Sequence, residues 1–273
     1  MILKPIANLL QSIVLLKKWI MRFFIFKFMP AYRRLTGSKY TRDLQNFKNI
    51  HPGKRIWIIA TGPSLREEDI LKLRNEITIG VNGTIYLYNR IGWKPTYFCC
   101  GDPVGYLLFK TEIDKAKIKN VFLSLLCKKN AEDMVFKPHY YDCYLKDCRW
   151  PSNNKRLKKY VDFSEDVGLQ GVYSGGRSIT TEAVQIAAYM GAKEIYLYGQ
   201  DCDYSGRKHF YDMEEEEVWT VDGQTSFNNA MIIFFENAKK YAERKGIKIY
   251  NATRGGKLEI FERVDLDEVL KDS

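Results

Sequence analysis

Arg55-Ile-Trp-Ile-Ile-Ala-Thr-Gly-Pro-Ser-Leu65 is the stretch that decides the fold of this chain. Its apolar run, Ile56 to Ala60, is typical of a buried strand and passes directly into a turn of small residues, Thr61 to Ser64. Open α/β proteins hold phosphates where a strand breaks into such a turn, because the N–H groups of the next helix point at it. The stretch predicts a nucleotide-type ligand. Gly-Pro-Ser is also ordinary turn chemistry, however, and Ser64 is an ordinary N-cap residue.

The composition of the 273-residue chain indicates a globular protein, with 45% hydrophobic and 28% charged residues. Disordered and collagen-like chains are excluded. The six cysteines form no Cys-x-x-Cys pair and have no histidine at ligand spacing, so we expect neither a metal site nor a disulfide framework. This cysteine usage indicates a reducing, cytoplasmic compartment in which cysteines serve as small core residues.

The N-terminal segment is both basic and apolar. Its apolar residues recur at helical spacing from Ile6 to Phe24, and a basic amphipathic helix of this kind suits an anionic membrane surface. The longest stretch without charge, Pro5 to Leu16, has only 12 residues, which is short for a membrane-spanning helix. A secretory signal and a helix that packs on the main domain or a partner subunit are the alternatives. Seven basic residues and no acidic one precede residue 35: Lys4, Lys17, Lys18, Arg22, Lys27, Arg33 and Arg34.

We divide the chain into this helix with its connector, residues 1–50, and a nucleotide-binding domain, residues 51–273. Apolar runs in the second part predict strands near 55–60, 77–81, 96–101, 120–125, 194–199 and 247–251. Helical patterns lie near 66–74, 104–117, 178–190 and 226–245. This alternation predicts a Rossmann-like, doubly wound α/β fold whose mainly parallel sheet is covered on both faces. The polar and aromatic residues 200–224 are expected to form a lid-like insertion over a ligand.

Polar clusters follow four of the predicted strands. Because ligands of doubly wound sheets bind along the carboxyl ends of the strands, we expect the clusters to meet at one edge. Asn82 offers a donor and an acceptor to a base or a ribose, and turn chemistry beside Gly83 is the alternative. The candidate ligand-binding residues in these clusters are Thr61, Gly62, Pro63, Ser64, Asn82, Gly83, Asp102, Gly199 and Asp201.

A second candidate anion site lies at the start of the helix near 178–190. Gly176 stands in a glycine pair beside an arginine, and Ser178 and Thr180 place hydroxyl groups at the helix N-terminus. An ordinary N-cap with a flexible lead-in is the alternative.

The segment 202–212 carries the candidate catalytic residues. A departing phosphate requires cationic and phenolic donors, and an acceptor hydroxyl requires a base, for which His209 is the candidate. A solvent-exposed loop with an incidental histidine is the alternative. The residues concerned are Tyr204, Arg207, His209 and Tyr211.

Two of these motifs, Thr61 to Leu65 and Gly191 to Asp201, resemble two related groups of proteins over roughly residues 53–251. One is the MptE-like domain, named after 6-hydroxymethylpterin diphosphokinase. The other is the bacterial CMP-sialic-acid sialyltransferases, which are similar in carrying an Asn at the position of Asn82. Their lid contributes tyrosines to the phosphate, and the resemblance implies this role for Tyr204 and Tyr211. The diphosphokinases resemble this chain less at Asp102, where they carry an Asp-x-Asp pair for Mg²⁺. The transferases carry their general-base histidine just before the helix that begins here near Ser226. At that place this chain has Gly223-Gln224-Thr225 instead.

The resemblance implies a glycosyltransferase of polysaccharide biosynthesis. It would move a sugar, sialic-acid-like, from a nucleotide-activated, CMP-linked donor to a cell-surface glycan acceptor with no metal and no required cofactor. Expected partners are the nucleotide-sugar, a glycan or lipid-linked acceptor and an anionic membrane surface contacted through residues 1–34, but no nucleic acid. A homo-oligomer is left open. The expected location is cytoplasmic and peripheral, at the inner face of the cell membrane. The alternatives are an ATP- and Mg²⁺-dependent diphosphokinase and a non-catalytic membrane-associated adaptor.

Overall fold

The computed structural model describes residues 39–143, 163–173, 178–203, 207, 209–211 and 224–271, with individual residues between 12 and 35. These residues form one eight-stranded sheet in the order β5-β4-β3-β2-β1-β6-β7-β8. Every neighbouring pair of strands is parallel. The chain builds outward from β1 to β5 and then returns to the other side of β1. The switch point of the sheet therefore lies between β1 and β6.

The strands are short, as is usual in such sheets, and the helices alternate with them. The strands are β1 (Arg55–Ile59), β2 (Thr78–Val81), β3 (Tyr97–Cys100), β4 (Val121–Ser124), β5 (His139–Tyr141), β6 (Glu194–Tyr198), β7 (Lys248–Asn251) and β8 (Glu262–Arg263). The α-helices are α3 (Lys39–Gln45), α4 (Glu67–Lys72), α5 (Tyr86–Ile91), α6 (Pro103–Ala116), α7 (Val167–Gln170), α8 (Ile179–Tyr189), α9 (Gln224–Arg244) and α10 (Leu266–Lys271). Three 3-10 helices complete the described elements: η2 (Leu73–Asn75), η3 (Asn82–Ile85) and η4 (Leu125–Ala131).

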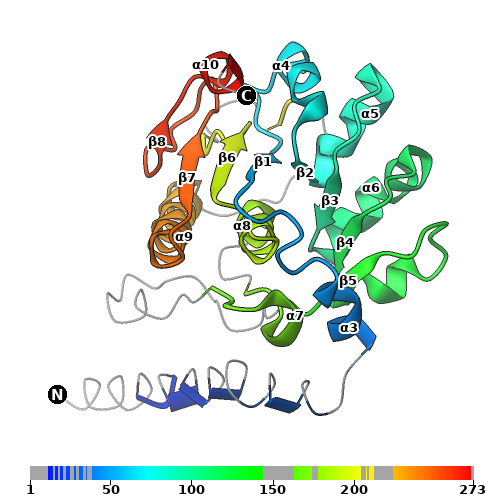
Figure 1. Cartoon of the computed structure of the whole chain (residues 1–273), viewed down its shortest axis with the longest axis vertical. Helices are drawn as coiled ribbons and strands as arrows, with labels where there is room; N and C mark the ends of the chain where they lie inside the picture. The colour runs from blue at the N-terminus through cyan, green and yellow to red at the C-terminus, as the bar shows by residue number, and fades with distance from the viewer. Residues whose placement is uncertain are drawn as a thin grey trace.

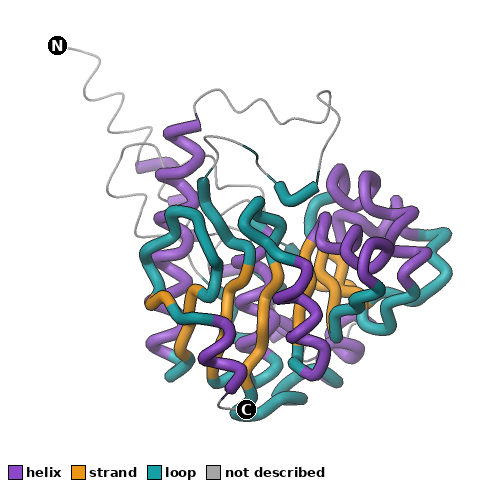
Figure 2. The backbone as a smooth tube through the Cα atoms, turned by 90° about the horizontal axis from the view of Figure 1, so that it is seen from above, coloured by secondary structure: helices purple, strands orange, loops and turns teal. Residues whose placement is uncertain are grey.

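Helices cover both faces of the sheet (Figure 1). One face carries α4, α5, α6 and α10, and the other carries α3, α7, α8 and α9. Figure 2 looks onto the first face, where the strands run side by side beneath the helices. In β1, Ile56 and Ile58 face one layer while Trp57 and Ile59 face the other. Strand β1 is therefore buried on both faces, as its unbroken apolar run predicts. This confirms the predicted doubly wound fold.

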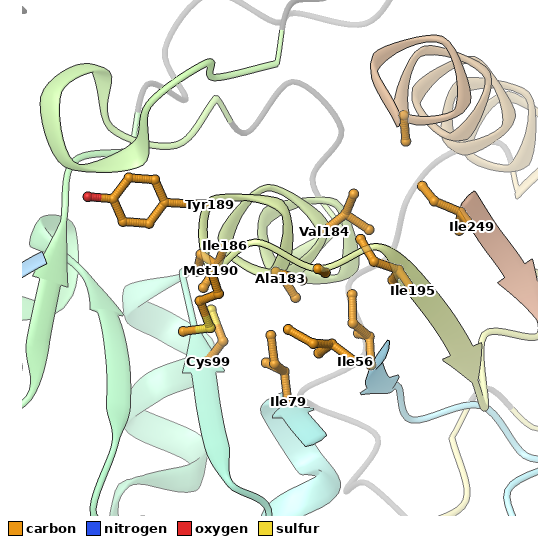
Figure 3. Close-up of a cluster of buried hydrophobic side chains, with 14 of the residues drawn as sticks. Ile56, Ile79, Cys99, Ala183, Val184, Ile186, Tyr189, Met190, Ile195 and Ile249 are labelled. Carbon is orange, nitrogen blue, oxygen red and sulfur yellow. The ribbon is translucent and has the colours of Figure 1, made fainter. Parts of the chain in front are cut away.

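Helix α8 lies at the centre of the larger core (Figure 3). Its side chains from Thr180 to Ala187 are all buried. Ala183, Ile186 and Met190 pack over the side chains that β1, β2 and β3 direct to this face. This packing fixes where the first turn of α8 lies relative to the strand ends.

The six predicted strands and four predicted helices are all present. The two strands that the sequence did not indicate are β5 and β8, which lie at the two edges of the sheet. Cys99, Cys100 and Cys127 are buried core residues, as predicted.

The described residues between 12 and 35 are helical, and Figure 1 shows this segment beyond the layer that contains α7 and α8. Rings stack along it, with Trp19 on Phe23 and Phe28 between Phe24 and Tyr32. Among the residues described, none of the helices combines the length and the apolar character needed to cross a bilayer.

Candidate functional site

The turns after β1 and β6 meet at the switch point. The N–H group of Gly62 donates to the carbonyl of Gly199 at 2.7 Å. Ser64 donates twice to the Asp201 carboxylate, from its N–H group to Oδ1 at 3.2 Å and from its hydroxyl to Oδ2 at 2.9 Å. Two candidate clusters that are far apart in the sequence are thus tied into one structure at the carboxyl edge of the sheet.

Asp201 shapes this turn from a buried position. The residue is only 6% exposed, and burial raises the pKa of its carboxyl group while the hydrogen bonds from Ser64 act in the opposite direction. Because both carboxylate oxygens accept from Ser64, the structure places Asp201 as the residue that holds the Thr61–Ser64 turn in shape.

Three glycines follow the strands β1, β2 and β3. At each of them, a side chain from a distant segment occupies the space that a Cβ atom would need. A Cβ atom on Gly62 would overlap the Asp201 carboxylate, and one on Gly83 would overlap the ring of Tyr211. A Cβ atom on Gly101 would overlap the carboxylate of Glu182 in α8. These positions require glycine because protein side chains use the space that any other residue would fill.

His209 lies at the turn after β1. Its Nδ1 is 3.0 Å from the hydroxyl oxygen of Thr61, and the N–H group of the next residue, Phe210, donates to the Thr61 carbonyl at 3.0 Å. Phe210 is buried in the core between the sheet and α4. The described part of the predicted lid therefore folds onto the candidate phosphate turn and brings His209 with it.

Tyr211 links this segment to the turn after β2. Its ring stacks on His209, with centroids 5.1 Å apart, and contacts Tyr86 and Phe109 at 5.0 and 6.3 Å. Of the other candidate catalytic residues, Arg207 is exposed, and Tyr204 lies outside the described residues. The structure thus gathers His209 and Tyr211 beside Thr61 and Gly83.

Asn82 begins η3 directly after β2. Its φ of 47° lies in the left-handed region, which asparagine tolerates better than most residues. Its side-chain Oδ1 is buried and has no hydrogen-bond partner among the described residues. A buried carbonyl oxygen without a donor is costly, so this atom is suited to a donor that arrives with a ligand.

Two of the remaining candidates have protein partners. Asp102 caps α6 by accepting from the N–H group of Gly105 at 2.9 Å. Thr180, in the first turn of α8, donates its hydroxyl to Gln200 Oε1 at 2.6 Å, which joins α8 to the turn after β6. Ser178 precedes α8 without a side-chain capping bond, and Gly176 lies outside the described residues. Within the described ranges no three His, Cys, Asp or Glu residues gather as a metal-ligand group.

Sequence reasoning missed the turn after β7, which crosses the same edge. Gly256, with a φ of 78°, lies against the Asp201 backbone, and the N–H group of Lys257 donates to the Asp201 carbonyl at 2.6 Å. Gly255 lies beside Ser64, where an added Cβ would be 3.3 Å from the serine Cβ. The signal was available, because the glycine pair Gly255-Gly256 follows the predicted strand at 247–251 after only three residues.

Sequence reasoning also missed Glu182. This carboxylate is buried under the end of β3 and accepts a hydrogen bond of 2.5 Å from the hydroxyl of Tyr141 in β5. The thiol of Cys143 lies 3.8 Å from its other oxygen. An acidic residue inside an otherwise uncharged helix was the available signal.

A doubly wound parallel sheet whose first and sixth strands end in joined polar turns defines a Rossmann-like fold with a ligand edge at its switch point. The chain belongs to the MptE-like family, because the family model described as 6-hydroxymethylpterin diphosphokinase MptE-like matches residues 28–207. This confirms the resemblance drawn from the motifs.

Two similar solved structures are glycosyltransferases. The MAf glycosyltransferase of Magnetospirillum magneticum AMB-1 has a TM-score of 0.53 and 14% identity over 84% of this chain. The chain spans only 38% of that protein's length. The sialyltransferase CstII of Campylobacter jejuni, in complex with a substrate analogue, cytidine-5'-monophosphate, has a TM-score of 0.47 and 18% identity over 79% of this chain and 86% of the other. At these identities the likeness concerns the fold. A search of curated proteins gave no match.

Proposed function

We propose that the protein is a glycosyltransferase that moves a sialic-acid-like sugar from a CMP-linked donor to a cell-surface glycan acceptor. The observation that carries the proposal is the carboxyl edge of the sheet, where the turns after β1, β2 and β6 converge. There, the buried Oδ1 of Asn82 is suited to accept from a base amino group or a ribose hydroxyl. The fold that the chain shares with the MAf glycosyltransferase supports it.

In the proposed reaction the nucleotide binds to the Thr61–Ser64 turn, Asn82 and the start of α8. The bond between the donor sugar's anomeric carbon and the phosphate oxygen breaks, and a bond forms from the acceptor oxygen to that carbon. His209 takes the proton of the acceptor hydroxyl. Arg207, Tyr204 and Tyr211 donate to the departing phosphate, whose charge is met by side chains in a metal-independent reaction.

The acceptor determines where the protein works. A cell-surface glycan under construction is carried on a membrane lipid, so we place the protein at the inner face of the cell membrane as a peripheral protein in polysaccharide biosynthesis.

A thermal-shift screen of CMP, UDP, GDP and ATP, with and without Mg²⁺, tests the donor. A ligand that binds only the native state raises the melting temperature, by an amount that grows with its concentration relative to its Kd. The proposal expects CMP to give the largest shift and Mg²⁺ to leave that shift unchanged. A shift with ATP alone that disappears with a chelator would contradict it.

That second outcome defines the alternative function, pyrophosphoryl transfer from ATP, which the family description favours. It would require carboxylates that hold Mg²⁺. Asp102 is the carboxylate at the end of β3, and its Oδ2 already caps α6. Asp201 and Asp203 are two further carboxylates at this edge.

Asn82→Gly is expected to weaken nucleotide binding about tenfold, because the ligand loses one hydrogen bond to a buried partner. Glycine keeps the left-handed backbone, so the melting temperature of the free protein should change by no more than a few degrees. Calorimetric titration with CMP measures the change in Kd. Asn75→Ala, at an exposed position in η2, is the control. Equal affinities for both variants would remove Asn82 from the site.

His209→Ala is expected to lower the rate of sugar transfer at least about 100-fold, because the acceptor hydroxyl loses its base. His139→Ala is the matched control, since His139 pairs with Asp43 at 2.8 Å on the edge strand β5. Turnover is measured as CMP release at saturating acceptor. Near-normal turnover of the His209 variant would end its assignment as the base.

A further inference from the structure

The helical segment before residue 36 exposes an unusual amount of apolar surface. More of the exposed large apolar side chains lie here than in all the rest of the described chain. Trp19, for example, is 63% exposed. Apolar side chains exposed in this number mark an interaction site. The side chains, each at least 44% exposed, are Ile13, Val14, Leu16, Trp19, Ile20, Phe23, Phe24, Phe28, Tyr32 and Leu35.

The charge of the same segment identifies what it contacts. No acidic residue precedes Asp43, whereas seven lysines and arginines precede residue 35. A protein partner needs no such uniform charge, but an anionic lipid surface attracts it.

We propose that this segment binds the surface of an anionic bilayer, lying in the plane of the interface with its aliphatic and phenylalanine side chains among the acyl chains. Trp19 and Tyr32, whose rings stack on Phe23 and Phe28, carry polar groups and sit at headgroup level. The lysines and arginines of the segment meet the lipid phosphates. This inference goes beyond the proposed transfer reaction and holds whatever chemistry the sheet edge performs.

Co-sedimentation of the full-length chain with vesicles tests the inference. Vesicles of phosphatidylcholine with 30% phosphatidylglycerol (roughly a third anionic lipid) should retain the protein, and pure phosphatidylcholine vesicles should retain little. Raising the salt concentration should release it, because charges at the surface are screened. Lys18→Glu with Arg22→Glu should weaken binding to anionic vesicles at least about 30-fold. Trp19→Ser with Phe23→Ser should weaken it by a similar factor.

Two control variants distinguish binding through this segment from nonspecific effects of net charge and of exposed apolar side chains elsewhere on the protein. Lys119→Glu with Lys137→Glu changes the net charge equally, and Val135→Ser removes an exposed apolar side chain of the folded domain. Both should bind vesicles like the original chain. Equal binding of the Lys18/Arg22 variant and its control would overturn the proposal. So would a dimer in lipid-free buffer that the Trp19/Phe23 variant abolishes, since the surface would then belong to a second copy. Nucleotide binding in each variant reports separately on the proposed function.

Discussion

Gly62→Ala is expected to destabilise the protein by about 2–3 kcal/mol and to abolish nucleotide binding. The added methyl group would overlap the Asp201 carboxylate and press on the carbonyl oxygen of Gly199. The carboxylate can rotate away, but the Gly199 carbonyl belongs to the backbone, so the turns after β1 and β6 must separate. Overpacking of this kind costs about 1–3 kcal/mol, and the hydrogen bonds to Ser64 are lost with it.

Differential scanning calorimetry should show a melting temperature lower by roughly 4–12 °C, and calorimetric titration should show no CMP binding. Gly105→Ala is the matched control. Gly105 lies inside α6 with only ordinary contacts around its Cβ position, and alanine favours a helix over glycine. Its stability should be unchanged or higher. If Gly62→Ala behaved like this control, the two turns would not be held as closely as the structure shows.

Arg254→Leu is expected to lower the free energy of unfolding by about 3–5 kcal/mol, more than Gly62→Ala, because it leaves a buried carboxylate without its arginine. Arg254, in the turn after β7, forms a two-pronged ion pair with Asp69 of α4, from Nε to Oδ2 at 2.6 Å and from Nη2 to Oδ1 at 2.9 Å. Asp69 is 1% exposed. Without Arg254 its charge would remain buried with the Tyr198 hydroxyl, at 2.6 Å, and the Lys72 ammonium group.

The same pair predicts how stability depends on pH. Burial alone would raise the pKa of Asp69, but the hydrogen bonds from Arg254, Tyr198 and Lys72 outweigh it and hold the pKa far below its ordinary value. A carboxyl group with a depressed pKa in the folded state stabilises the fold above the pKa of the unfolded chain, about 4. This contribution is lost as the pH falls below that value. In Arg254→Leu the acid-dependent loss below about pH 4 should be smaller.

Urea unfolding at pH 7 and in steps down to pH 3 measures both effects. Arg254→Lys should recover part of the stability, because an ammonium group restores the charge but not the two-pronged geometry. The double variant Asp69→Asn/Arg254→Leu should be more stable than Arg254→Leu alone, since the buried carboxylate that has lost its arginine is then a neutral amide. A double variant less stable than either single one would show that packing of the arginine stem, and not its charge, supports this region.

The sequence was sufficient for the central sheet but not for its edges. Strands such as β1 are buried on both faces, so their apolar runs predict them. β5, His139–Tyr141, carries no apolar run, and β8 consists only of Glu262 and Arg263. An edge strand pairs on one side and needs less apolar surface, so backbone pairing with β4 and β7 defines these strands and their composition does not.

The candidate site was predictable where it follows strand ends and unpredictable where it depends on long-range contact. Parallel strands place the turns at Thr61, Asn82 and Gly199 on one edge by topology alone. Two contacts depend on how the chain returns from β5 to β6. Asp201 binds Ser64, which is 137 residues away, and Tyr211 covers Gly83. Periodicity carries no information on such pairings, and it likewise did not indicate that the Gly255-Gly256 turn would cross Asp201.

The contacts at Gly62, Gly83 and Gly101 mean that the ligand edge is completed late in folding. Each is completed by a residue from the C-terminal part of the chain: Asp201, Tyr211 or Glu182. A nascent chain that has formed β1 to β5 holds the glycines but none of the groups that complete them. Competence to bind a ligand therefore arises only when both parts of the polypeptide have folded together, and a bound nucleotide would strengthen their cooperativity.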